Sequence, residues 1–245
     1  MDLFENDLFE NTHEQILHIA EGAMLLRRFA LTNEVHLLND LKSIIAKSPL
    51  RHMVTPGGFT MSVAMTNCGK LGWVSDKKGY RYDALNPSTG APWQAMPESF
   101  LQLAKNAAAE AGYANFVPDA CLINQYEIGA RMSLHQDKDE QDFSQPIVSV
   151  SLGCAATFLF GELKRSDKPT KILLQHGDVV VWGGKSRLNY HGIMPLQASN
   201  IQTNSHEAFG ACRFNLTFRK IRLIRHSERS EESRIFKQRI IFYST

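Results

Sequence analysis

The chain has 245 residues, of which 43% are hydrophobic and 21% charged, and its formal net charge is +2. This balance is typical of a globular protein with a full core, and the longest apolar runs fall short of the roughly 18 residues that a membrane span needs. The positive charge comes from residues 221–245, which hold six Lys/Arg and three Asp/Glu and leave the rest at −1. Bulk charge therefore gives no argument for nucleic-acid binding, which needs a local basic patch.

The chain begins with an acidic stretch that has neither the basic start nor the apolar run of a signal peptide. The four cysteines are scattered without a C-x-x-C pair, as expected of reduced thiols: Cys68, Cys121, Cys154 and Cys212. We therefore expect a cytoplasmic protein that has no membrane partner and is a monomer.

We assign residues 1–19 to an N-terminal extension and predict two helices in the part that follows, 20–115. Apolar residues at helical spacing mark the first helix: Leu37, Leu38, Leu41, Ile44 and Ile45. Thr32 or Asn33 is the expected N-cap, and Ser48-Pro49 the expected end. A second stripe predicts the other helix, with Pro97 in its first turn and Gly112 as its C-terminal cap: Phe100, Ala104, Ala107, Ala108 and Ala111.

A strand is predicted between these helices, at 59–68. It is followed by a stretch that we interpret as irregular, 69–93, which contains several aromatic residues: Trp73, Tyr80, Tyr82 and Trp93. Trp73 and Tyr80 lie in polar sequence without strand periodicity, so packing is the simplest role for each.

The part from 116 to 220 is predicted to be mostly strand. Its short apolar or alternating runs, divided by Gly and charged turns, lie at 120–127, 147–152, 156–160, 171–174, 179–182 and 213–219. Many short strands with this spacing indicate a sandwich or barrel, of which the jelly roll is one standard form. The fold class is thus mostly β with flanking helices. The polar end, 221–245, is expected to be a disordered appendage without a catalytic role.

Two His-x-Asp triplets occur, where about 0.4 are expected by chance, so the motif alone is weak evidence. His176-Gly177-Asp178 directly precedes the run 179–182, where Gly-Asp most simply makes the turn into a strand. His135-Gln136-Asp137 is followed 54 residues later by His191, after several strand-like runs. That gap is long enough for strands to cross a barrel and return.

A His-x-Asp pair with a distant His can bind one face of Fe(II) and leave the opposite face open. His135 and Asp137, two positions apart, are expected on one face of a strand, where both can reach the metal. With neutral imidazoles and one carboxylate the site would carry a net charge of +1, which favours a dianionic co-substrate. His135, Asp137 and His191 are therefore the predicted metal ligands and catalytic centre.

The run Arg213–Arg219 indicates what that co-substrate is. Alternation places Arg213, Asn215, Thr217 and Arg219 on one face. The two arginines are separated by roughly 20 Å of extended chain, and by leaning inward they could bind both carboxylates of a five-carbon diacid. Together with the iron triad, this strand predicts a non-haem oxygenase that uses 2-oxoglutarate and O2.

Over residues 20–220 the sequence resembles the AlkB family of alkylation-repair dioxygenases. The similarity rests on long runs: 53–58 (MVTPGG), 60–69, 118–124 (PDACLIN), 133–140, 146–153, 176–184 and 215–219 (NLTFR). The resemblance implies a double-stranded β-helix (jelly roll) at 116–220 with an N-terminal nucleotide-recognition lid within 20–115. It implies oxidative demethylation of N-alkylated bases, 1-methyladenine and 3-methylcytosine, in single- or double-stranded DNA, with RNA left open, and release of formaldehyde, succinate and CO2.

The resemblance also assigns roles to residues. Asn124, Tyr126, Arg213, Asn215 and Arg219 would bind 2-oxoglutarate, with Arg213 at the distal carboxylate and Arg219 near the metal-bound one. Trp73 would stack on the lesion base with His135 on its other face, Tyr80 would contact the flanking backbone, and Asp139 would lie near the exocyclic amine. Apart from the resemblance, six cations are candidate phosphate contacts, although a solvated surface charge is the default role of each: Arg51, Lys77, Lys78, Arg81, Lys138 and Arg165.

A hydroxylase of an amino acid or another small molecule shares the iron and arginine chemistry and is the alternative. The aromatic segment 69–93 favours the dealkylase, because a small-molecule enzyme has no need of Trp73 and Tyr80 beside a basic groove.

Overall fold

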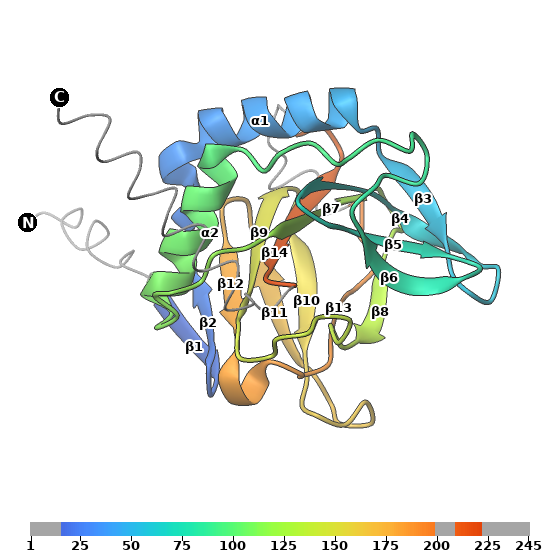
Figure 1. Ribbon diagram of the computed structural model, residues 1–245. Helices are drawn as coiled ribbons and strands as arrows, with labels where there is room; N and C mark the ends of the chain where they lie inside the picture. Colours follow the sequence, from blue (N-terminus) through green and yellow to red (C-terminus); the bar gives the residue numbers. More distant parts are fainter. Residues whose placement is uncertain (1–15, 199–208, 222–245) are drawn as a thin grey trace, which may run out of the picture.

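Two antiparallel sheets form the body of the protein in the computed structural model, which describes residues 16–198 and 209–221 (Figure 1). The strands of the larger sheet follow in the order β1 (Ile16–Ala20), β2 (Ala23–Leu26), β12 (Val179–Trp182), β9 (Ile147–Gly153), β14 (Arg213–Arg219), β7 (Ala120–Tyr126), β4 (Thr60–Gly69) and β3 (Arg51–Val54). Those of the smaller sheet are β11 (Thr170–Leu174), β10 (Ala156–Phe160), β13 (His191–Ile193) and β8 (Met132–His135). This arrangement confirms the predicted mostly-β, jelly-roll class of fold.

Two helices, α1 (Glu34–Lys47) and α2 (Glu98–Glu110), cover one face of the larger sheet (Figure 1). α1 begins after Asn33 and ends before Ser48, as predicted. We had expected Pro97 in the first turn of α2, but it is the N-cap and so lies one position earlier. Gly112 ends α2 with φ of 88°, and the N–H groups of Gly112 and Tyr113 bond back to Ala109 and Ala108, which is a Schellman motif. Neither helix of the described part is long and apolar enough to cross a membrane.

Strand alternation separates an apolar face from a polar one on β14. Phe214, Leu216 and Phe218 pack in the core beneath the helices. The intervening polar residues, from Arg213 to Arg219, turn to the opposite face, where they line a pocket between the two sheets. Because every residue of β14 is buried, the polar side chains of this strand lie inside the protein rather than in solvent.

The stretch 69–93 is not irregular, contrary to our expectation. It contains a hairpin, β5 (Gly72–Asp76) and β6 (Gly79–Asp83), so Trp73 and Tyr80 lie on strands. Lys77 and Lys78 form the turn between the strands, and Gly79, the first residue of β6, follows it with φ of 116°. Polar and aromatic residues on both strands hid the alternation, because this hairpin packs at the edge of the protein rather than in a two-sided core (Figure 1).

The larger sheet combines strands from segments that we had separated on the basis of the sequence. β1 begins inside the expected 1–19 extension, and β1 to β4 precede residue 115. Ile221, which we assigned to the C-terminal appendage, is 3% exposed, and its N–H donates to Asp119 Oδ1 at 2.7 Å. The predictions for residues 1–15 and 222–245 fall outside the described residues.

Candidate active site

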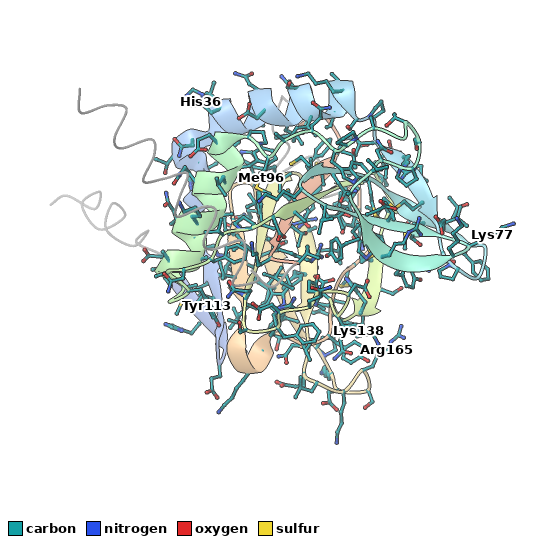
Figure 2. All side chains as sticks on the ribbon, in the orientation of Figure 1. His36, Lys77, Met96, Tyr113, Lys138 and Arg165 are labelled. Carbon is teal, nitrogen blue, oxygen red and sulfur yellow. The ribbon has the colours of Figure 1, made fainter. Side chains whose placement is uncertain are left out.

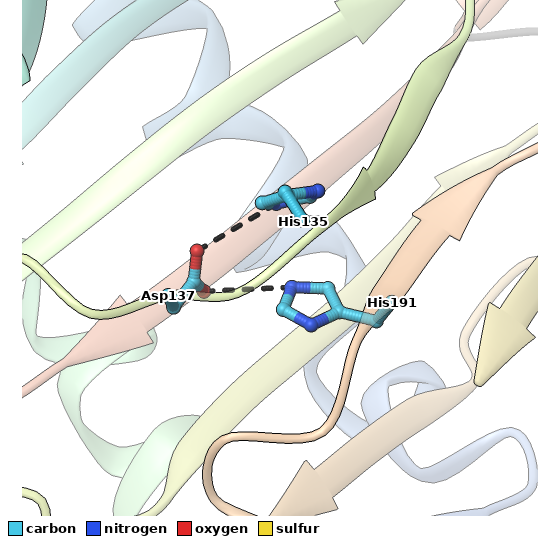
Figure 3. Close-up of side chains that lie close together, drawn as sticks. All are labelled: His135, Asp137 and His191. Atoms are coloured by element: carbon cyan, nitrogen blue, oxygen red, sulfur yellow. Dashed lines mark ion pairs between the residues drawn. The ribbon is translucent and has the colours of Figure 1, made fainter. Parts of the chain in front are cut away.

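The two predicted metal-binding histidines face each other across neighbouring strands. His135 on β8 pairs directly with His191 on β13, and their ring centroids are 4.4 Å apart. Asp137 lies between them: its Oδ1 is 3.6 Å from His135 Nε2, and its Oδ2 is 3.6 Å from His191 Nε2 (Figure 3). The three ligand atoms lie within 4.8 Å of one another. The structure therefore brings together the three residues selected from sequence.

Asp137 does not lie on the strand face that we expected. β8 ends at His135, so Asp137 is not on the same strand face but in the segment that follows. An i, i+2 spacing across a strand end does not preserve the strand's alternation. The aspartate is held by tertiary contacts instead.

Backbone carbonyls select the tautomer of both histidines. His135 Nδ1 donates to Ser133 O at 2.9 Å, and His191 Nδ1 donates to Asn189 O at 3.1 Å. Each imidazole must therefore carry its proton on Nδ1 when neutral, which leaves the Nε2 lone pair directed at Asp137 and available to a metal.

The electrostatics favour the protonation states that metal ligands require. Burial, with the neighbouring His191, lowers the pKa of His135 to about 4. Burial raises the pKa of Asp137, but Arg219 and the two histidines outweigh it and hold that pKa well below its usual range. Near neutral pH the site thus offers a neutral His135 imidazole and the Asp137 carboxylate. Two nitrogens and one carboxylate on one side of a pocket are a donor set that suits Fe(II).

The polar face of β14 lines the same pocket as the histidines. Ladder pairing places Arg213 opposite Tyr126 and Asn215 opposite Asn124. The five predicted 2-oxoglutarate residues therefore line the same pocket as the triad: Asn124, Tyr126, Arg213, Asn215 and Arg219.

Arg213 is a buried cation with unused donors. It is 1% exposed, and its Nη2 donates to Ser151 Oγ at 3.1 Å. Its Nε and Nη1 have no hydrogen-bond partner among the described residues. The guanidinium lies 5.0 Å from the ring centroid of Tyr126, and burial lowers its pKa. Because a buried unpaired charge is costly, this arrangement fits an anionic ligand that is bound in the pocket.

Arg219, at the other end of β14, lies beside the triad. Its Nη2 and Nε donate to Asp137 Oδ2 at 2.6 and 3.0 Å, and its Nε is 3.3 Å from Glu140 Oε1. Arg213 and Arg219 thus differ: the first has open donors at one end of the pocket, and the second is already paired beside the metal ligands.

The predicted base-binding residues lie outside the lining of this pocket, on neighbouring segments. Trp73 and Tyr80 stack on each other, with centroids 5.6 Å apart and planes at 14°. Trp73 Nε1 donates to Asp139 Oδ2 at 2.9 Å, which connects the β5–β6 hairpin to the segment that carries Asp137. Arg165 belongs to the exposed loop between β10 and β11 (Figure 2).

The expected phosphate-binding cations differ in how far they are already paired. Arg81 makes two hydrogen bonds to Asp76, at 3.0 and 2.9 Å, and lies 3.7 Å from Asp83, so its charge is compensated. Arg51 donates to Ser88 at 2.5 Å. Lys77 projects from the tip of the β5–β6 hairpin (Figure 2). Arg81 is thus already paired with carboxylates within its own hairpin.

The second His-x-Asp triplet has the structural role predicted for it. Gly177, with φ of 86°, forms the turn into β12. Asp178 is fully buried and pairs with Arg27 at 2.6 Å. His176 accepts from the N–H of Gly153 at 2.9 Å and contacts Glu34 at 3.0 Å. This triplet is separate from the triad.

Sequence reasoning missed two buried charges next to the triad, Glu140 and Arg187. Their side chains are 1% and 3% exposed, and they form an ion pair at 3.2 Å. Both occur in polar loops, where a charged residue is normally solvated, so no local pattern marked them as buried. The only signal was that Glu140 falls within the run 133–140 shared with the AlkB family.

Residues 22–219 match the model of the 2OG-Fe(II) oxygenase superfamily, and this match, the two-sheet fold and the His-Asp-His site define a 2-oxoglutarate and Fe(II)-dependent oxygenase. The chain is 55% identical, over 87% of its length and 97% of the relative's, to the alpha-ketoglutarate-dependent dioxygenase AlkB of Escherichia coli K12. The protein belongs to the AlkB family.

More distant relatives agree with this assignment. The nucleic acid dioxygenase ALKBH1 of Homo sapiens is 32% identical over 51% of this chain and 32% of its own length. Among solved structures, that of OsALKBH1 superposes with a TM-score of 0.71 at 29% identity, covering 84% of this chain and 99% of the other.

Proposed function

We propose that the protein removes methyl groups from alkylated nucleic-acid bases by oxidation, with 1-methyladenine and 3-methylcytosine in DNA as its main substrates and RNA as a second polymer. The observation that carries the proposal is the pocket, in which buried Arg213 has open donors and three metal-binding side chains face β14. The human relative ALKBH1 is named a nucleic acid dioxygenase, which supports the substrate class.

His135, Asp137 and His191 are assigned to Fe(II), through two Nε2 atoms and one carboxylate. Asn124, Tyr126, Arg213, Asn215 and Arg219 are assigned to 2-oxoglutarate. Iron, 2-oxoglutarate and O2 together supply the oxidant that hydroxylates the N-methyl carbon, with succinate and CO2 as products. The hydroxymethylated base then loses formaldehyde and regains its hydrogen-bonding edge.

The protein contributes binding, orientation and exclusion of water. Arg213 would pair its open N–H groups with the distal carboxylate of 2-oxoglutarate, because a planar fork matches a carboxylate. Arg219 holds Asp137 and would bind the proximal carboxylate. Buried side chains around the pocket, Leu122, Phe158 and Trp182 among them, keep bulk water away from the reacting atoms.

Base recognition is assigned to Trp73, Tyr80, Asp139 and Arg165. The hydrogen bond from Trp73 to Asp139 supports the assignment, since it holds the hairpin aromatic within reach of the metal segment. A methylated, cationic base is attracted by an aromatic face and by a carboxylate. The base must leave the helical stack, or belong to a single strand, to reach this site.

The decisive experiment is formaldehyde release from a 3-methylcytosine oligonucleotide in the presence of Fe(II), 2-oxoglutarate and O2. We expect stoichiometric formaldehyde and restored cytosine, with no turnover by Asp137→Ala. Consumption of 2-oxoglutarate that is stimulated by amino acids, with no formaldehyde from methylated DNA or RNA, would instead establish the small-molecule hydroxylase.

We also assign the protein to the cytoplasm and to a monomeric state. Its four cysteines are free thiols, which supports a reducing compartment. Sedimentation of the full chain tests the monomer.

A further inference from the structure

Arg187 lies beside the metal site and has no part in the function proposed above. It follows the 3-10 turn η2 (Gly184–Ser186) and precedes the metal ligand His191 by four positions. Its side chain is 3% exposed, although it belongs to a loop. A charge buried this deeply needs several partners, because desolvation of an arginine costs more than one hydrogen bond returns.

Among the described residues, the hydrogen bonds, ion pair and cation–π contact of the Arg187 guanidinium all go to one segment, 136–146, which connects β8 to β9. Its Nη1 donates to the carbonyl of Asp137 at 2.8 Å, and its Nε donates to the carbonyl of Gln145 at 3.0 Å. Its Nη2 is 3.2 Å from Glu140 Oε2, and the guanidinium carbon is 5.3 Å from the ring centroid of Phe143. Segment 136–146 therefore wraps around a single side chain.

This segment has neither helix nor strand. Its backbone carbonyls thus lack the ladder partners that hold the two histidines in place. Arg187 supplies two of these missing partners, one of them at Asp137 itself. The position of the metal carboxylate consequently depends on a residue from the other loop of the site.

Glu140 closes a ring of charges around Asp137. Its Oε2 faces Arg187 at 3.2 Å, while its Oε1 is 3.3 Å from Arg219 Nε and accepts from the hydroxyl of Tyr82 at 2.8 Å. Arg219 in turn bonds the Asp137 carboxylate, and Arg187 bonds the Asp137 carbonyl. Arg219 thus holds the carboxylate of Asp137 and Arg187 its backbone carbonyl, and Glu140 lies between the two arginines.

We propose that Arg187 is a positioning residue for the metal centre, which sets the place and direction of the Asp137 carboxylate through segment 136–146 and Glu140. The proposal rests on the triad being the metal site. Arginine is required because its planar fork bonds in three directions at once, whereas the lysine ammonium is a point charge on a flexible stem. Loss of partners around metal ligands typically lowers metal affinity by about 10- to 100-fold.

The test uses the full chain with Co(II) as the probe metal, in the absence of 2-oxoglutarate. Calorimetry gives the dissociation constant, and the visible spectrum of bound Co(II) reports its ligand geometry. The variants are Arg187→Met, which removes the charge, and Arg187→Lys, which keeps it. Arg27→Lys is the matched control, because Arg27 also pairs with a buried aspartate, Asp178 at 2.6 Å, away from the triad. Asp137→Asn reports loss of the carboxylate ligand.

We expect Arg187→Met to raise the Co(II) dissociation constant by about 10- to 100-fold and Arg187→Lys by about fivefold or more, both with an altered spectrum. Arg27→Lys should lower the melting temperature and leave affinity and spectrum unchanged. A folded Arg187→Lys protein with the parent's spectrum and a dissociation constant within about twofold overturns the proposal, whether or not Arg187→Met folds. If Asp137→Asn also binds Co(II) like the parent, the metal site itself is wrong.

Discussion

Arg219 donates two hydrogen bonds to the same oxygen of Asp137, at 2.6 and 3.0 Å, and that oxygen lies 3.6 Å from the nitrogen of His191 that faces the metal site. Arg219 of β14, the strand proposed to bind 2-oxoglutarate, thus also contacts the candidate metal centre. Arg213 shares its strand but makes no contact with the triad among the contacts described. The two arginines should therefore respond differently to the same substitution.

Arg213→Lys should raise the apparent KM for 2-oxoglutarate by about tenfold or more, because a charge-assisted hydrogen bond in a pocket contributes about 1.5–3 kcal/mol. Its Co(II) affinity should stay that of the parent. Arg219→Lys should raise the apparent KM for 2-oxoglutarate and also weaken Co(II) binding, because Arg219 holds Asp137 as well. Titration of 2-oxoglutarate in the formaldehyde assay, beside Co(II) calorimetry, separates the two effects. Activity without any 2-oxoglutarate would contradict the mechanism.

Removal of a metal ligand should abolish turnover. His135→Ala, Asp137→Ala and His191→Ala each take away one of the three donor atoms. His176→Ala instead removes contacts away from the triad, among them those to Gly153, Glu34 and Phe209. We expect His176→Ala to be less stable but to keep most of its activity. A folded but inactive His176→Ala protein beside an active His191→Ala protein would mean that the wrong histidine was assigned.

Lesion charge should control the rate. A cationic base such as 3-methylcytosine gains about 0.5–2 kcal/mol from an aromatic face that neutral 3-methylthymine does not gain. The value of kcat/KM should therefore be several-fold higher for 3-methylcytosine in one oligonucleotide context. The ratio of the two kcat/KM values should be smaller in Trp73→Ala. Single-stranded DNA should be repaired with a kcat/KM at least as high as that of duplex DNA, because no base pair must be broken. Equal rates for both lesions in the parent, or an unchanged ratio in the variant, would refute a charge-based preference.

The C-terminal boundary of the fold should lie at Ile221, one residue later than the sequence indicated. Ile221 is buried, and its N–H bonds Asp119. A chain that ends at Ile221 should melt within about 2 °C of the full chain. Removing Ile221 as well should lower the melting temperature by about 4–8 °C, because a buried isoleucine contributes about 2 kcal/mol. Equal melting of the two truncated chains would show that Ile221 contributes nothing.

The sequence predicted the elements whose pattern is local. The runs at 156–160, 179–182 and 213–219 match β10, β12 and β14 in full, because apolar residues, or alternation in a buried strand, mark them without reference to other segments. β13 was missed, and β8 was expected only as a strand through His135 and Asp137, without bounds, although both carry candidate metal ligands. β8 is four residues long and β13 three, and they are polar or glycine-containing. Pairing with other strands defines them: β8 pairs with β13, and β13 also pairs with β10.

The residues of the candidate site also divide into those that a local sequence pattern marks and those that only the folded chain brings together. His135, Asp137, His191, Arg213 and Arg219 were found because a motif or an alternating strand connects residue type with spacing. Arg187 could not be found in this way, since its role depends on three contacts with residues 42 to 50 positions away, which only the folded chain brings together.

β8 is an edge strand of the small sheet, and among the described residues it pairs with β13 alone. A ladder this short gives little resistance to local opening. A metal bound by His135 and Asp137 on one side and by His191 on the other would cross-link β8 and β13. Amides of 132–137 should then exchange with deuterated water faster in the iron-free protein than in the loaded one. Iron starvation would accordingly do more than stop turnover, because the iron-free protein would also be cleaved more easily by proteases at this edge.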